Sequence, residues 1–208
     1  MKTDTKIAPG MDGVLPTAEQ PSGYPAPCAV RVVSTDPEFD ALAPAWDSLL
    51  SRSGDTVFQT FEWQRTWWKY FHDGLELRIL VFETDGDIVG IAPFCLEKIR
   101  FAGLTIARQM KFIGVGLSDY LSPMVQPGWE RKVLSAMADH LIVPAGEWDV
   151  FDLEDINESW AGFPKLAGLL IGRGMPISSY QGSVCPSVPL PTSAEELLGN
   201  QNYRWKLK

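Results

Sequence analysis

The sequence predicts an α/β domain in which helices pack on a mixed, mostly antiparallel sheet. A β-branched run opens the ordered part of the chain, a strand meander follows two helical segments, and helices then alternate with strands. The dipeptide Asp85-Gly86 is a strong hairpin turn, which makes the two strands around it antiparallel. No glycine-rich loop joins a first strand to a first helix, so a doubly wound dinucleotide-binding domain is excluded.

The first expected elements are a strand and a helix separated by a turn. Residues 28–33 are rich in β-branched side chains and predict a strand. Asp36 and Pro37 look like the cap and first position of a helix, but Pro44 would cost the interior of that helix about 3 kcal/mol. We therefore expect a short turn here, then a helix that begins near Pro44 and ends at Gly54.

Residues 61–71 predict a second helix, because Thr60 is a good N-cap and Trp63 and Trp67 share a face four residues apart. The remaining expected elements are strands over residues 75–83, 88–96, 107–113, 120–125 and 148–153, helices over 128–143 and 159–172, an extended stretch over 177–190 and a helix that opens at Thr192 and Ser193.

Length, charge and cysteine count argue against several classes of protein. Its 208 residues, 45% of them hydrophobic, suffice for one self-supporting domain. A net charge of −8 without a large basic block argues against nucleic acid as a partner. Cys28, Cys95 and Cys185 are odd in number and form no Cys-x-x-Cys pair, which argues against a zinc ribbon or a disulfide scaffold and favours a reducing compartment.

Residues 1–27 hold five prolines among small polar residues and no apolar segment, so we expect a flexible N-terminal extension. A secretory signal needs roughly 7–15 apolar residues and a membrane span about 20, and neither run occurs in the sequence. The expected location is therefore the cytoplasm, with no membrane span.

A glycine motif after the strand over residues 107–113 is the first candidate for a binding site. Lys111, Gly114 and Gly116 resemble the loop with which GNAT acetyltransferases hold the pyrophosphate of acetyl-CoA. Residues 117–123 are too short and too proline-broken for the helix that this site requires, and Asp119 would repel phosphate. We therefore interpret the two glycines as a turn at the end of a strand and reject them as the cofactor site.

A dense aromatic cluster is the second candidate. It could be a stacking platform for a sugar or peptide, or part of the core, since aromatic side chains bury large areas. The helical spacing favours the core for Trp63 and Trp67 and leaves Trp68 and Tyr70 as the expected exposed members. The whole cluster comprises Phe58, Phe61, Trp63, Trp67, Trp68, Tyr70 and Phe71.

Acidic residues around the strand over 148–153 are the third candidate. One of them with a raised pKa could deprotonate an amine, but a solvated sheet edge and a helix N-terminus explain the same residues. The two histidines, His72 and His140, have no metal ligand near them in sequence, and Cys95 is best explained as a small core residue. The acidic residues are Glu147, Asp149, Asp152, Glu154, Asp155 and Glu158.

Several segments together resemble bacterial CelD-like acetyltransferases, a family of the GNAT superfamily that is associated with cellulose and exopolysaccharide biosynthesis and is distantly FemAB-like. They occur in family order over about residues 30–190. The matching segments are 57–63 with Trp67 and Trp68, 88–94, 111–114, 118–120 and 148–153.

The resemblance implies a GNAT-like domain over residues 28–190 that is the first of two in tandem, with residues 191–208 as the start of a basic inter-domain helix that is truncated here. It implies transfer of an acetyl group from acetyl-CoA to an amine or hydroxyl of an envelope or exopolysaccharide precursor, with the acetyl-CoA bound mainly by a second domain and no metal. The nearest catalytic candidates are Asp119 and Tyr120, and Trp63, Trp67, Trp68 and Tyr70 are candidates for acceptor binding. The alternative is a non-catalytic module that binds an acceptor or docks on a second domain.

Overall fold

The sheet has six strands and is mixed, as the sequence predicts. The computed structural model describes residues 28–53, 56–142, 147–157, 160–182 and 193. The strand order is β1-β2-β3-β4-β6, with β5 paired to β3, and every pair is antiparallel except the parallel pair β4 and β6. The strands are β1 (Ala29–Val33), β2 (Leu75–Thr84), β3 (Asp87–Phe101), β4 (Leu104–Phe112), β5 (Met124–Val125) and β6 (Val150–Phe151).

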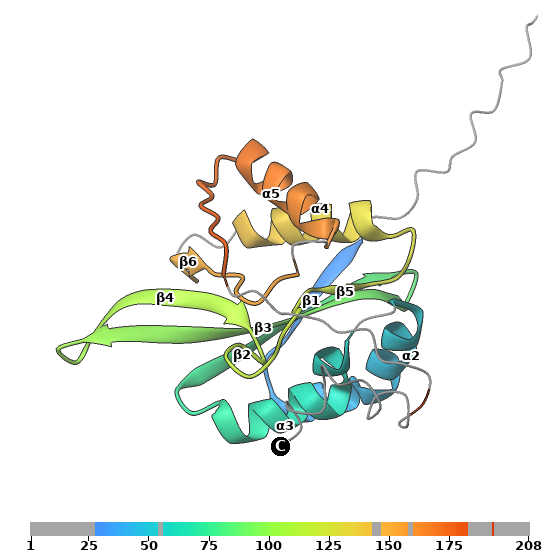
Figure 1. The fold of residues 1–208 in the computed structure, drawn as a ribbon, viewed down its shortest axis with the longest axis horizontal. Helices are drawn as coiled ribbons and strands as arrows, with labels where there is room; N and C mark the ends of the chain where they lie inside the picture. Colours follow the sequence, from blue (N-terminus) through green and yellow to red (C-terminus); the bar gives the residue numbers. More distant parts are fainter. Residues whose placement is uncertain (1–27, 54–55, 143–146, 158–159, 183–192, 194–208) are drawn as a thin grey trace, which may run out of the picture.

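Helices cover both faces of this sheet (Figure 1). The elements α2 and α3 lie against one face, and α4 and α5 lie against the other. The expected fold class, an α/β domain with a mostly antiparallel sheet and packed helices, is confirmed. The helices are α1 (Asp36–Ala41), α2 (Ala43–Ser53), the short 3₁₀ helix η1 (Val57–Gln59), α3 (Phe61–Phe71), α4 (Glu130–Ile142) and α5 (Gly162–Gly172).

Two hydrophobic cores form because side chains alternate along the central strands. In β2, Leu80 and Phe82 point into the core beneath α4 and α5, whereas Ile79 and Val81 point into the core beneath α1, α2 and α3. All four side chains are at most 1% exposed. The sheet is therefore a middle layer that is buried on both faces, which explains why β2 is hydrophobic along most of its length.

The expectation of a short turn after β1 is wrong, because residues 36–41 form a helix, α1. Its N-cap is Thr35 and not Asp36: the Thr35 side chain accepts from the Glu38 N–H, and the Glu38 carboxylate accepts from the Thr35 N–H at 3.1 Å. This reciprocal capping box stabilises a helix that is only six residues long. Pro44 lies in the first turn of α2, where its missing N–H costs nothing.

Several strand and helix ends also differ from expectation. The strands expected over residues 88–96 and 107–113 run further, and meet at a tight turn in which Ala102 and Gly103 have φ of +50° and +82°. The strands expected over 120–125 and 148–153 shrink to β5 and β6. In the first of these segments, Tyr120 has φ of +60° and is not extended. The helix expected over 159–172 is α5, which begins at Gly162. Of the extended stretch expected over 177–190, residues 177–182 are not in a strand.

Some expectations fall outside the described residues. They are the flexible extension over 1–27, the helix stop at Gly54, the extended stretch over 183–190, the helix after Ser193, and Cys185 and Glu158.

Candidate functional site

The carboxyl end of the parallel pair β4 and β6 is where the sheet departs from its antiparallel pattern. Gln109 pairs with Val150 and Met110 with Phe151, and the Asp152 N–H donates to the Met110 carbonyl at 2.9 Å. Loops that follow the carboxyl ends of parallel strands meet at one edge of a sheet, where ligands of α/β proteins bind. The loop over residues 113–123 and the segment over 152–157 meet at this edge.

The glycine loop after β4 closes onto the segment after β6. Gly114 and Gly116 have φ of +104° and +85°, so both glycines are needed for the shape of the turn. The Gly116 N–H donates to Oδ2 of Asp155 at 3.3 Å, and the Leu121 N–H donates to the Asp155 carbonyl at 2.9 Å. Asp155 thus binds the loop through both its side chain and its backbone.

Two residues other than glycine have positive φ at this contact. Tyr120 and Asp155 both lie at +60°, in the left-handed region that costs a side-chain-bearing residue roughly 1–3 kcal/mol. Such strain persists where the surrounding structure holds it, and here the Leu121–Asp155 hydrogen bond lies between the two strained residues.

The short helix η1 and the start of α3 hold the other side of the same loop. The Trp63 indole N–H donates to Oγ of Ser118 at 2.9 Å, and Nε2 of Gln59 donates to the carbonyl of Ser122 at 2.7 Å. The segments over 57–63 and 118–120, which the sequence singled out separately, are therefore in direct contact. Gln59, Ser118 and Ser122 are all buried, so these hydrogen bonds fix the loop to the helix.

Gly114 has no room for a side chain. A Cβ at this position would lie 2.8 Å from Oγ of Ser118 and 3.2 Å from Nε2 of Gln64. Gln64 is fully buried, and its Nε2 donates to the Phe58 carbonyl at 2.8 Å. Its Oε1 atom has no hydrogen-bond partner within the described part of the chain.

The acidic side chains that form the third candidate lie on both sides of β6 along the chain. Asp152 accepts from Nε2 of Gln109 at 2.7 Å, and Asp149 pairs with Arg108 across the parallel strands. Desolvation raises the pKa of Glu154, and the charges of Asp152 and Asp155 raise it further. A raised pKa is the direction of shift that a base for an amine needs, so Glu154 is a candidate for that role.

The aromatic cluster divides into buried and exposed members. Trp67 and Trp68 are 7% and 3% exposed, Trp63 is half-buried, and Tyr70 is 66% exposed. The expectation that Trp68 is exposed is wrong, whereas the expectations for Trp67 and Tyr70 are confirmed.

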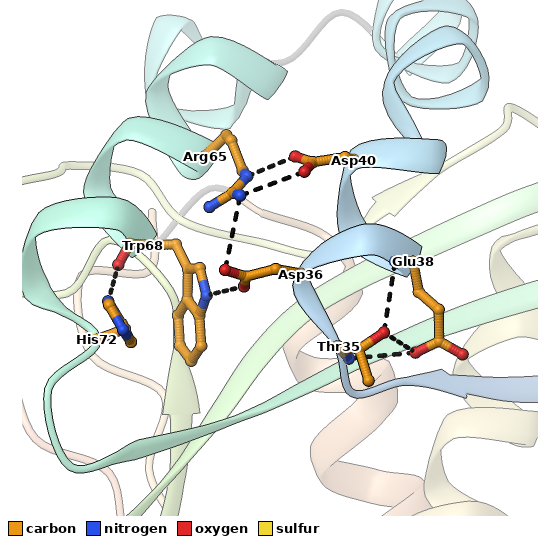
Figure 2. Close-up of polar contacts among 7 residues, drawn as sticks. All are labelled: Thr35, Asp36, Glu38, Asp40, Arg65, Trp68 and His72. Carbon is orange, nitrogen blue, oxygen red and sulfur yellow. Dashed lines mark hydrogen bonds and ion pairs between the residues drawn. The ribbon is translucent and has the colours of Figure 1, made fainter.

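A polar contact between α1 and α3 explains the burial of Trp68 (Figure 2). Its indole N–H donates to Oδ1 of Asp36 at 2.8 Å, so α1 covers the ring. Arg65, one turn earlier on α3, pairs with Asp40 at 2.6 Å and with Asp36 at 3.7 Å. Of the four aromatic candidates, Tyr70 is therefore exposed, Trp63 is half-buried, and Trp67 and Trp68 are buried, so the four do not share one exposed surface.

The catalytic candidates lie in the glycine loop. Asp119 is exposed and Tyr120 half-buried, next to the Ser118 hydroxyl that Trp63 binds. No group of three His, Cys, Asp or Glu side chains that could hold a metal ion occurs among the described residues. Burial raises the pKa of Cys95 to about 12, which is consistent with a core residue and not a nucleophile. In the described part of the chain, no helix is long and apolar enough to cross a membrane.

Sequence reasoning missed the residues that join the site together. Asp155 appears in the acidic stretch, but its contact with Gly116 spans 39 residues and leaves no local signal. Gln59, Ser118 and Ser122 are polar residues with no motif of their own. The only signal for Gln59 and Ser118 was that their segments belong to the same family resemblance, and Ser122 had no signal.

Three comparisons with known proteins give structural similarity alone. No protein-family model matches the chain, and the search of curated proteins found no match. The aminoglycoside antibiotic 6'-N-acetyltransferase AAC(6')-Ih from Acinetobacter baumannii is similar with a TM-score of 0.46 and 10% identity, over 77% of this chain and 100% of that chain. A possible acetyltransferase from Clostridium difficile 630 has a TM-score of 0.45 and 9% identity, over 79% and 100%.

A third similar structure is the ribosomal-protein-alanine N-acetyltransferase from Brucella melitensis biovar Abortus 2308, with a TM-score of 0.38 and 15% identity over 76% of this chain and 99% of that chain. At these TM-scores and identities, the similarities assign no activity to this chain.

Proposed function

We propose that this chain is a GNAT-like domain that acts in acyl transfer and holds the acceptor, while acetyl-CoA is bound by a second domain. The support is the sequence resemblance together with the geometry of the sheet edge. The segments that carry the resemblance, 57–63 and 118–120, are in contact through Trp63 and Ser118, next to the parallel pair β4 and β6.

We assign acetyl-CoA to another domain because the Gly116 N–H is hydrogen-bonded to Asp155. A pyrophosphate site needs free backbone N–H groups and a helix N-terminus, and tolerates no carboxylate beside them. Here the Gly116 N–H already binds a carboxylate, and the residues between Gly116 and β5 form no helix. The residues of this loop therefore do not fit the phosphates of acetyl-CoA.

The sheet edge next to the loop holds a group that can act on an acceptor. We propose Glu154 as the base that takes the proton of an amine or hydroxyl acceptor, because its pKa is raised and it follows β6 at the carboxyl end. On α3, Tyr70 presents an exposed aromatic ring of the kind on which sugars stack. The proposed acceptor class, an envelope or exopolysaccharide precursor, offers an amine or hydroxyl for the first group and a sugar ring for the second.

A second candidate function is that of a docking module without an acceptor site. The adjacent side chains of Tyr70 and Phe71, 66% and 51% exposed on α3, favour it because exposed aromatic residues are typical of protein interfaces. The two candidates differ in whether the chain binds a saccharide.

A saccharide titration separates these functions. Tryptophan emission of the full chain is followed during titration with a glucosamine oligosaccharide, which offers both amines and hydroxyls. The acceptor-side proposal predicts saturable binding that is weakened several-fold in Tyr70→Ala and unchanged in Ile171→Ala, an exposed apolar residue on α5. Absence of binding to the wild-type chain would contradict the acceptor-side proposal and favour the docking module.

A further inference from the structure

The hairpin of β3 and β4 projects past the helices on both faces of the sheet (Figure 1). It ends in a tight turn at Ala102 and Gly103. Near this turn, the hairpin carries a group of exposed apolar side chains on two neighbouring strands, which we call the apolar arm face. Its members are Ile99, Phe101, Leu104 and Ile106, with 36%, 73%, 71% and 63% exposure.

Phe101 and Leu104, the two most exposed members of the apolar arm face, lie on the same side of the hairpin because they pair directly with each other. Arg100 precedes Phe101 on β3, points to the opposite side and pairs with Thr105. The register shifts between Ile99 and Arg100, and Ile106 has no partner residue on β3 at this irregularity. The hairpin tip is thus amphipathic, with an apolar side and a polar, basic side.

The arm is basic in an acidic protein. Residues 98–107 contain Lys98 and Arg100 and no acidic residue, although the whole chain has a net charge of −8. Lys98 pairs with Glu76 near the base of the arm at 2.6 Å, so Arg100 is the cation closest to the tip. A positive tip on a negative body complements an anionic surface and keeps the acidic body away from it.

We propose that this arm inserts into the interface of a membrane that contains anionic lipids. Its apolar part is about three residues long on each strand, or roughly 10 Å at 3.3 Å per residue, close to the depth of about 5–10 Å that interfacial segments reach. Water remains at that depth, so the outer edges of the two strands stay hydrated. Arg100 is placed to reach the phosphates while its neighbours enter the apolar layer.

A second copy of the chain is a weaker explanation. A stable protein interface buries roughly 800 Å² per partner, from about 20–30 residues on each side. Four side chains at the tip of a projecting hairpin supply only a small part of such an interface. A fluid lipid surface needs neither that area nor a complementary shape, and reversible binding through a few apolar side chains and a cation suits it.

Vesicle sedimentation of the full chain tests the proposal. The wild-type protein should sediment with vesicles of phosphatidylcholine and phosphatidylglycerol, less with phosphatidylcholine alone, and less as salt rises. Phe101→Asp with Leu104→Asp should abolish the binding, and Arg100→Glu should weaken it about tenfold. Ile171→Asp, an equally exposed apolar site on α5, should bind as the wild type does.

The other outcomes overturn the proposal. They are failure of the wild-type chain to bind the anionic vesicles, equal binding to both vesicle types, and full binding by the double variant. A wild-type dimer in sedimentation velocity that the double variant dissociates would assign the arm to a second copy instead. Because the substituted side chains are exposed, unchanged far-ultraviolet circular dichroism should show that every variant is folded.

Discussion

At the scale of single residues, the candidate site depends on backbone conformations that few residue types adopt. Gly114 and Gly116 have positive φ in the loop after β4, and Tyr120 and Asp155 accept the same region at a cost. The two glycines are compatible in sequence with a phosphate loop or with a turn, and the sequence context favours the turn. The hydrogen bond from Gly116 to Asp155 supports the turn.

Substitution of the two glycines should have unequal effects. Gly116→Ala meets no atom within 4 Å and suffers backbone strain alone, about 1 kcal/mol. Gly114→Ala adds a 2.8 Å contact with Oγ of Ser118, in a region held by buried hydrogen bonds, and should cost about 2–3 kcal/mol. Urea unfolding of both variants measures the difference. Equal costs would contradict the tight contact between the loop and α3.

Glu154 should make the stability depend on pH in a known direction. Its pKa is raised in the folded state, because desolvation and the charges of Asp152 and Asp155 disfavour the carboxylate. The folded state then holds the proton more strongly than the unfolded chain, so stability falls as pH rises through the raised pKa. Glu154→Gln removes this loss and should gain stability relative to the wild type between about pH 4 and about pH 7.

Asp40 supplies a control of opposite sign. The hydrogen bond from Arg65 lowers the pKa of Asp40, so its contribution to stability is present above the ordinary pKa and is lost as pH falls. Asp40→Asn should therefore lose stability relative to the wild type as pH rises to about pH 4, near the ordinary Asp pKa, and change little above it. Urea midpoints at about pH 2, pH 4 and pH 7 measure both trends, and identical trends for the two variants would refute the assignment.

At the scale of elements, local sequence signals predicted helices well where the N-cap was evident. Thr60 identified α3 with its observed ends, and its side chain accepts from the Trp63 N–H. The helix α1 was missed because Pro44 was weighed as an interior residue, whereas the capping box of Thr35 and Glu38 starts a separate helix before it. The extra length of β3 and β4 was missed because the turn at Ala102 and Gly103 lacks the usual Asn-Gly or Asp-Gly signature.

The contact of α1 with α3 gives a prediction for Trp68 and Tyr70. Trp68→Phe keeps an aromatic ring but removes the hydrogen bond to Asp36 and leaves a void, so it should cost about 1–3 kcal/mol. Tyr70→Phe changes an exposed side chain and should stay within about 0.5 kcal/mol of the wild type. Thermal unfolding compares the two. If Trp68→Phe were as stable as the wild type, the burial of Trp68 beneath α1 would be contradicted.

At the scale of the whole molecule, hydrophobic pattern and hairpin signals were enough to predict a mixed sheet with helices packed on it. They could not predict the parallel pairing of β4 with β6, because the residues that pair are about 40 apart and the crossover runs through β5 and α4. For the same reason they could not show that Asp155 binds the glycine loop. The aromatic and acidic stretches were visible in sequence, but which members face solvent depends on α1 and on the sheet edge.

We propose that the glycine loop, which is closed by Asp155, does not hold acetyl-CoA. Calorimetric titration of the folded wild-type chain with acetyl-CoA tests this proposal. A closed loop predicts binding no tighter than a Kd of about 1 mM, or about −4 kcal/mol. A saturable site with a Kd of about 1 µM or tighter, about −8 kcal/mol, would contradict it.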